Sequence, residues 1–136
     1  MDPEEPPKTP IIFTCSGAAD TGGLADAASR ALSRSGVARM YCLAGVGSRV
    51  EEIMADMSKA ERLVSVDGCT NDCSRKVLEA AGFQAAIHLR ITDLGMPKGQ
   101  TPYSEAKVRR ITDELRRRLL ASPEEPGAPE DGEAGV

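Results

Sequence analysis

The chain has 136 residues, the size of one domain, and 40% of them are hydrophobic, which is enough for a single core. Aromatic residues make up only 3% and tryptophan is absent, so the core must be built mainly from aliphatic side chains and methionine. The formal net charge is −4, but residues 10–120 alone hold 13 acids and 16 bases, and a balance of +3 is too small to indicate a nucleic-acid-binding protein.

Both ends of the chain have the composition of disordered segments. Residues 1–9 are acidic and Pro-rich, the opposite of a secretory signal with its basic start and apolar centre. Residues 121–136 are rich in Pro, Gly and Glu and cannot bury enough apolar surface to fold. No run approaches the roughly 18 apolar residues of a membrane span. We therefore expect one folded domain over residues 10–120 and a cytoplasmic location.

Four short β-rich runs alternate with segments of helical period. The runs are PIIFTC (10–15), ARMYCL (38–43), RLVSVD (62–67) and FQAAIHLRI (83–91). The first helical segment spans about 21–34, with Gly36 placed to end it, and the third spans about 71–81, before Gly82. The expected helices bury the following residues: Leu24, Ala28, Ala31 and Leu32; Val50, Ile53, Met54 and Met57; Val77, Leu78 and Ala81; Val108, Ile111, Leu115 and Leu119.

Capping patterns predict where the second and fourth helices begin. Ser48 and Glu51 form a capping-box pattern at the start of the second. Thr101 suits the N-cap of the fourth, and Pro102 its first helical position.

This alternation predicts a small three-layer, Rossmann-like α/β domain. Its mostly parallel sheet should have at least four strands and helices on both faces. Because crossovers are right-handed, successive strands point the same way, and the strand-to-helix turns lie together at the carboxyl edge of the sheet. Open α/β sheets usually bind ligands at this edge.

The four cysteines all fall at these turns. Cys15, Cys42 and Cys69 are 27 residues apart each time, and Cys73 lies in the first turn of the third helix. A reducing cytoplasm makes metal binding or chemistry more typical of them than stable disulfides. Neighbouring strands lie about 4.8 Å apart, and sulfurs sharing one tetrahedral zinc lie about 3.8 Å apart. Because a helix start also favours a thiolate, the pattern predicts a shared zinc site, although some of these cysteines can instead be ordinary small buried residues.

Four stretches together resemble the DGC-domain family, small proteins to which zinc binding is ascribed. They are FTCSGAADTGGLADAASRAL, MYCLAGVG, VSVDGCTNDCSRKVLEAAGF and ITDLGMPKG, and the likeness runs from about residue 11 to 120. The resemblance implies that Cys15, Cys42, Cys69 and Cys73 are the family's four metal ligands.

The residues around Cys69 suit a sharp turn into a helix. Gly68 lets the backbone turn where a side chain would crowd the site. Asp67 is expected either to accept hydrogen bonds from loop amides, behind the ligands, or to serve as an ordinary turn residue. Thr70, Asn71 and Asp72 are expected to cap the helix.

Other candidate sites are weaker. The Gly-rich turns SGAADTGG and AGVGS match neither a dinucleotide fingerprint nor a Walker pattern. His88, inside the fourth strand, is expected to be a packed or surface residue. Asp93 and Lys98 resemble the family's TDLG…K segment and are expected to line the site or to belong to an ordinary surface loop. The Arg-rich fourth helix has interleaved acids, which is typical of a solvated face.

Three functions fit this pattern. The first is a zinc-binding protein that senses, carries or exchanges a thiophilic metal or metalloid. The second is a thiol redox or sulfur-transfer enzyme, with Cys73 as nucleophile and Cys69 as resolving thiol. The third is an iron–sulfur cluster protein, since four thiolates suit a cluster equally well. Whether the protein is an enzyme and which proteins it binds both stay open.

Overall fold

The computed structural model describes residues 9–121, and the expected tails therefore lie outside the described residues except for Thr9 and Ala121. The elements follow the predicted alternation of strands and helices. In chain order they are β1 (Ile11–Thr14), α1 (Asp20–Arg34), β2 (Arg39–Met40), α2 (Leu43–Gly47), α3 (Glu51–Lys59), β3 (Leu63–Asp67), α4 (Cys73–Ala80), β4 (Ile87–Arg90), the 3-10 helix η1 (Ile91–Leu94) and α5 (Glu105–Ala121).

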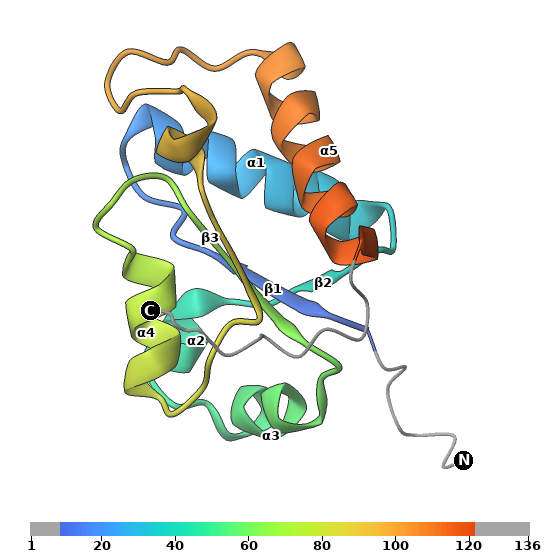
Figure 1. The fold of residues 1–136 in the computed structure, drawn as a ribbon. Helices are drawn as coiled ribbons and strands as arrows, with labels where there is room; N and C mark the ends of the chain where they lie inside the picture. Colours follow the sequence, from blue (N-terminus) through green and yellow to red (C-terminus); the bar gives the residue numbers. More distant parts are fainter. Residues whose placement is uncertain (1–8, 122–136) are drawn as a thin grey trace.

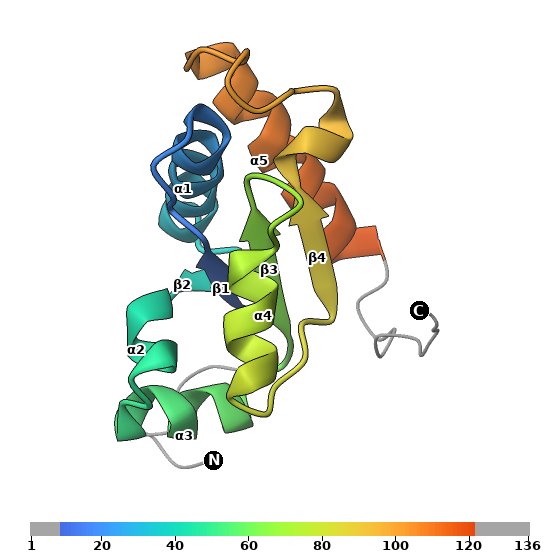
Figure 2. The same cartoon turned by 90° about the vertical axis from the view of Figure 1, so that its left-hand side faces the viewer.

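The four strands form one sheet in the order β2-β1-β3-β4, with every neighbouring pair parallel. Ile11 pairs with Arg39 on one side and with Leu63 on the other. Helices α1 and α5 cover one face, and α2, α3 and α4 lie on the other (Figures 1 and 2). The small three-layer α/β fold with a parallel sheet is thus confirmed.

Alternation along the central strands explains the two apolar cores. Ile12, Val64 and Val66 point toward α1 and α5, with Leu24, Leu32, Ile111 and Leu115 among the helical residues that they meet. Ile11, Phe13 and Leu63 point the other way, with Val46, Met57 and Leu78. Successive side chains of a strand face opposite sides, so one short strand supplies both cores.

The prediction of the second helix is wrong at the start of that helix. Residues 43–59 form two helices, and the AGVGS stretch expected as a loop lies mostly in α2. Ser48 is the C-cap of α2 and not the N-cap of the next helix. Its hydroxyl donates to the Ala44 carbonyl at 2.9 Å, and Val50 is 40% exposed rather than buried. Short apolar runs with two glycines carry little periodicity, which is why α2 is not apparent in the sequence.

The last helix begins later than predicted. Thr101 donates its hydroxyl to the Pro97 carbonyl, and Pro102 precedes the helix. The side chain of Ser104 accepts the Lys107 amide at 3.1 Å, as an N-cap does. In the described part of the chain, no helix is long and apolar enough to cross a membrane.

Candidate functional site

The sheet order brings three cysteines to neighbouring strand ends. Cys42, Cys15 and Cys69 follow β2, β1 and β3, which are adjacent in that order, and all three strands end at the same edge. Cys73 is the first residue of α4, the helix that follows β3. All four cysteines therefore lie in turns at the carboxyl edge of the sheet.

Two of these thiols are half-buried and have nearby donors. The sulfur of Cys15 accepts the Gly68 amide at 3.3 Å, which links the turn after β1 to the turn after β3. The sulfur of Cys69 lies 3.6 Å from Nζ of Lys98. Cys42 and Cys73 are exposed to solvent.

The sulfurs do not meet at one point. Within residues 9–121, only Asp67, Asp72 and His88 form a group of three ligand-bearing side chains whose ligand atoms lie within 4.8 Å of one another. Four thiols fit a thiophilic ion by their chemistry. To bind the same ion, however, the turns after β1, β2 and β3 must bring their sulfurs closer together.

Asp67 fixes the start of α4. This buried carboxylate accepts the Ser74 amide at 2.7 Å and the Arg75 amide at 3.2 Å, which belong to the first turn of the helix. Nε2 of His88 lies 2.9 Å from Oδ2 of Asp67, the oxygen that also accepts the Arg75 amide. Asp67 thus satisfies two unpaired amides of the helix that carries Cys73.

Asp72 was expected to cap α4, but its side chain makes no capping bond. Its backbone is left-handed (φ 54°), and its carboxylate accepts two hydrogen bonds from Arg90, at 2.7 and 2.8 Å. Arg75 adds a third contact at 3.0 Å. The hydrogen bonds from Arg90 hold the pKa of Asp72 below its usual value. Asp67, five residues upstream on β3, therefore does the capping that Asp72 was predicted to do.

The packing around Gly68 explains why this residue is glycine. Its φ is not positive, so turn geometry does not require it. A Cβ built at Gly68 would instead lie 2.6 Å from the Gly22 nitrogen and 2.8 Å from the Thr21 carbonyl carbon. A Cβ at Gly22 would in turn lie 2.7 Å from the Gly17 oxygen. The crowding expected at Gly68 comes from the backbone of α1.

The loop that carries Lys98 is held by the first residue of α1. Asp20 accepts the Gly99 amide at 2.8 Å and the Thr101 amide at 2.9 Å. These two bonds hold the pKa of Asp20 below its usual value. Nothing in the sequence pairs Asp20 with a loop some eighty residues away, so sequence analysis missed this contact.

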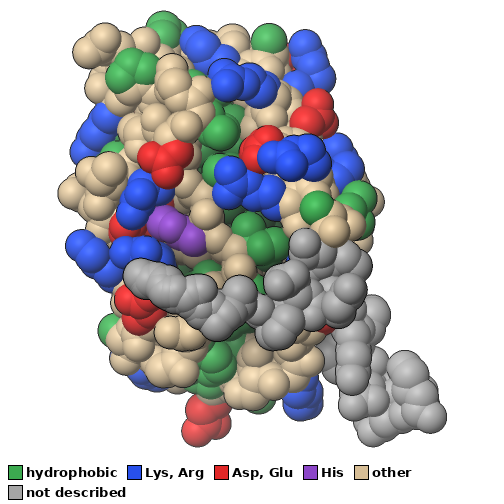
Figure 3. All heavy atoms as spheres, viewed as in Figure 1, with side chains coloured by type: hydrophobic (Ala, Val, Ile, Leu, Met, Phe, Trp, Pro, Cys, Tyr) green, Lys and Arg blue, Asp and Glu red, His purple; other side chains and the backbone are tan. Residues whose placement is uncertain are grey.

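The other candidate residues pair with charged side chains. Asp93 is 57% exposed, and its carboxylate lies 3.6 Å from the Arg90 guanidinium. His88 lies half-buried between Asp67 and Asp72, and Figure 3 shows it at the surface among basic and acidic side chains. Arg90, to which the sequence assigned no role, pairs with both Asp72 and Asp93 and so links these two carboxylates.

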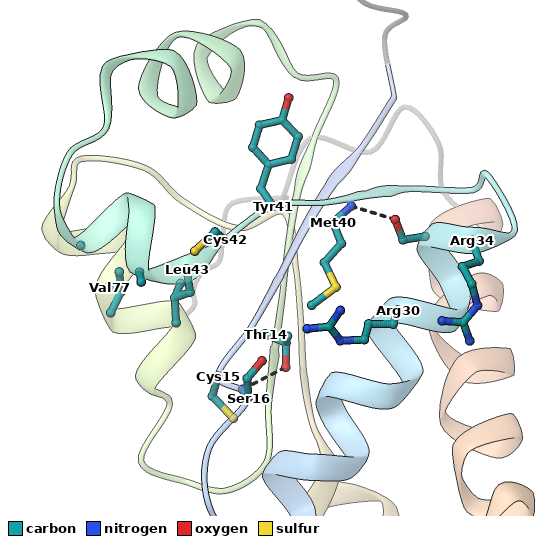
Figure 4. Close-up of a pocket in the computed structure, with 13 residues that line it drawn as sticks. Thr14, Cys15, Ser16, Arg30, Arg34, Met40, Tyr41, Cys42, Leu43 and Val77 are labelled. Carbon is teal, nitrogen blue, oxygen red and sulfur yellow. Dashed lines mark hydrogen bonds between the residues drawn. The ribbon is translucent and has the colours of Figure 1, made fainter.

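Cys15 and Cys42 also line a pocket with a volume of about 990 Å³. Figure 4 shows these side chains with Arg30, Arg34 and Met40 around the opening. The remaining lining residues are Thr14, Ser16, Ser33, Tyr41, Leu43, Ala44, Gly47 and Val77.

Similarity to known proteins extends over most of the described residues. A family model described as DGC domain matches residues 11–115. The Anaerobic and virulence modulator AnvM of Pseudomonas aeruginosa is 29% identical over 118 residues, covering 86% of this chain and 88% of that protein. No solved structure gives a significant match.

Proposed function

The chain belongs to the DGC-domain family, and we propose that Cys15, Cys42, Cys69 and Cys73 bind one thiophilic metal ion, with zinc as the first candidate. The observation that supports this most is the sheet order, which sets three of the thiols on adjacent strand ends and the fourth at the start of the next helix. The four thiolates would form a closed tetrahedral shell around a bound zinc, and ligand exchange would require one of them to leave the ion.

The surroundings of the thiols suit negative charge. Four thiolates around a divalent ion leave two negative charges in excess. The Gly68 amide already donates to Cys15, and the Lys98 ammonium lies beside Cys69. Cys73 is at the N-terminus of α4, where the helix dipole is positive.

We propose a role in sensing, carrying or exchanging a metal or metalloid rather than in holding the fold together. Two apolar cores form on the two faces of the sheet without any contribution from the cysteines. Cys42 and Cys73 are exposed, so an incoming ion can reach them. The relative's name calls it a modulator, which agrees with a regulatory role better than with a purely structural one.

Metal analysis of the full chain tests this proposal. Protein purified with and without oxygen should carry about one zinc per chain, and a quadruple Cys→Ser variant should carry none. Wild-type protein that has no metal and takes up none in titration would end the proposal. A brown colour with broad visible absorption in the anaerobic sample would indicate an iron–sulfur cluster instead.

A thiol redox or sulfur-transfer function is the second candidate, and the position of Lys98 favours it. The Lys98 ammonium lies 3.6 Å from the Cys69 sulfur, and Cys73, four residues further along the chain, is the first residue of α4. Mass spectrometry after mild oxidation should then detect a Cys69–Cys73 disulfide. Absence of that disulfide, together with slow alkylation of both thiols, would rule against this function.

A further inference from the structure

The pocket beside Cys15 and Cys42 has a charged wall that the metal site does not use. Arg30 and Arg34 come from the last turns of α1, one helical turn apart, and both line the pocket. None of its lining residues is acidic. The pocket therefore presents two guanidinium groups and no carboxylate.

A hydrogen bond to Asp26 orients the Arg30 side chain. Its Nε donates to Oδ2 of Asp26 at 2.8 Å, and the hydroxyl of Ser16 donates to the other oxygen of that carboxylate at 2.8 Å. Among the described residues, neither the terminal nitrogens of Arg30 nor the Arg34 guanidinium has a hydrogen-bond partner. Figure 4 shows Arg30 reaching from α1 toward Met40. Its free nitrogens can thus bind a ligand in the pocket.

The rest of the lining is largely apolar. Met40, Leu43 and Val77 are half-buried and come from three different elements or turns on the other side. A volume of about 990 Å³ lies at the upper end of the range of small-molecule sites, about 300–1,000 Å³. A ligand that fits this lining has an anionic group at one end and hydrocarbon at the other.

We propose that this pocket binds a small organic carboxylate, with the carboxylate on Arg30 and Arg34 and the hydrocarbon against Met40. A guanidinium pairs with a carboxylate through two parallel hydrogen bonds, which gives both affinity and orientation. The bound molecule lies beside Cys15 and Cys42, so it occupies the space next to two of the proposed metal ligands. The binding itself does not depend on a metal.

Titration of the metal-free, reduced, ¹⁵N-labelled full chain tests the proposal by NMR. The probes are hexanoate, acetate, neutral hexanamide and inorganic phosphate. Hexanoate should give saturable shifts in residues 30–44 and bind at least tenfold more tightly than the other three. Each methylene that becomes fully buried should lower the Kd by about fourfold, and hexanamide lacks the charge.

Paired variants separate this site from general charge effects. Arg30→Ala with Arg34→Ala should raise the Kd of hexanoate at least tenfold. Lys59→Ala with Lys76→Ala removes the same charge from exposed positions outside the pocket and should leave the Kd unchanged. If the alanine pair does not fold, Arg30→Gln with Arg34→Gln replaces it, and the dispersion of the spectrum reports folding in each case.

Several results would overturn the proposal. Equal affinities for hexanoate and hexanamide would leave no role for the arginines. If phosphate bound as tightly as hexanoate, the apolar side chains of Met40, Leu43 and Val77 would have no role in binding. A Kd that does not change in either arginine variant would place the ligand elsewhere.

Discussion

At the turn from β3 into α4 two carboxylates are buried and paired, whereas residues 16–18 of the turn after β1 and Cys42 after β2 are exposed. Asp67 and Asp72 are 1% and 3% exposed, and amides, arginines and His88 surround their carboxylates. Cys42, in contrast, starts a five-residue helix without any side-chain capping bond. The carboxyl edge therefore has two halves. The half with Cys69 and Cys73 is fixed, and the half with Cys15 and Cys42 is adaptable. A site built in this way can hold a ligand on the fixed half while the other half opens to admit it.

The cysteines themselves give the largest expected difference between the halves. Cys69→Ser should weaken zinc binding at least a thousandfold, about 4 kcal/mol, because an alcohol binds zinc far less well than a thiolate and the buried, hydrogen-bonded Asp67 and Asp72 restrain this turn. Cys15→Ser should retain a weaker three-thiolate site, since the exposed turn after β1 can shift to admit water.

Competition with a chromogenic chelator measures both affinities on one scale. Equal zinc affinity for wild type and Cys69→Ser would show that Cys69 is not a ligand, and the shared site would have to be abandoned. Losses of equal size for Cys69→Ser and Cys15→Ser would remove the distinction between the two halves.

Asp67→Ala tests how much the fixed half depends on one carboxylate. The change leaves the Ser74 and Arg75 amides and His88 without their acceptor in a buried place. We expect the free energy of unfolding to fall by about 3 kcal/mol, measured by urea denaturation. Asp93→Ala, at an exposed carboxylate with one long ion pair, serves as the control and should change little. A loss at Asp67 no greater than at Asp93 would contradict the capping role.

Gly68→Ala tests the close approach of the β3–α4 turn to α1. The added methyl group would overlap backbone atoms of Thr21 and Gly22, which cannot move aside as a flexible side chain would. We expect a loss of about 2 kcal/mol in the same urea experiment. Gly23→Ala, in α1 with nothing within 4 Å of the new Cβ, should instead stabilise the helix by about 0.5–1 kcal/mol. Equal effects of the two changes would mean that the turn yields easily.

The smallest effect concerns the loop that holds Lys98 against Cys69. Asp20 has a lowered pKa, so its hold on the loop is complete above the ordinary value of 3.8 and is lost as the pH falls through the lower value of the folded protein. NMR titration of the Gly99 and Thr101 amides should therefore give a midpoint below 3.8. Asp20→Asn should abolish this titration. A midpoint at or above 3.8 would show that the two amide bonds do not form in solution.

The sequence was sufficient for the fold but not for the contacts within the site. Alternating runs predicted the parallel sheet, Cys15, Cys42 and Cys69 after strands, and Cys73 in the first turn of a helix. These features depend on local periodicity and on the handedness of crossovers. The cap supplied by Asp67, the Asp72–Arg90 pair and the hold of Asp20 on residues 99 and 101 join residues distant along the chain, or depend on a left-handed backbone at Asp72. Local patterns carry no information about such partners, so Asp72 was assigned a cap that another residue provides.

The order of the strands also has a consequence for synthesis. β3 lies between β1 and β4, and Ile11 pairs with Leu63, 52 positions further along the chain. Contacts of such long range form late in folding, and a chain made from its N-terminus exposes Cys15 and Cys42 before Cys69 exists. The thiols of a growing chain are therefore separate ligands without a common geometry. Any selectivity for one metal must begin only when β3 enters the sheet and the newly complete edge brings all four cysteines into the same region.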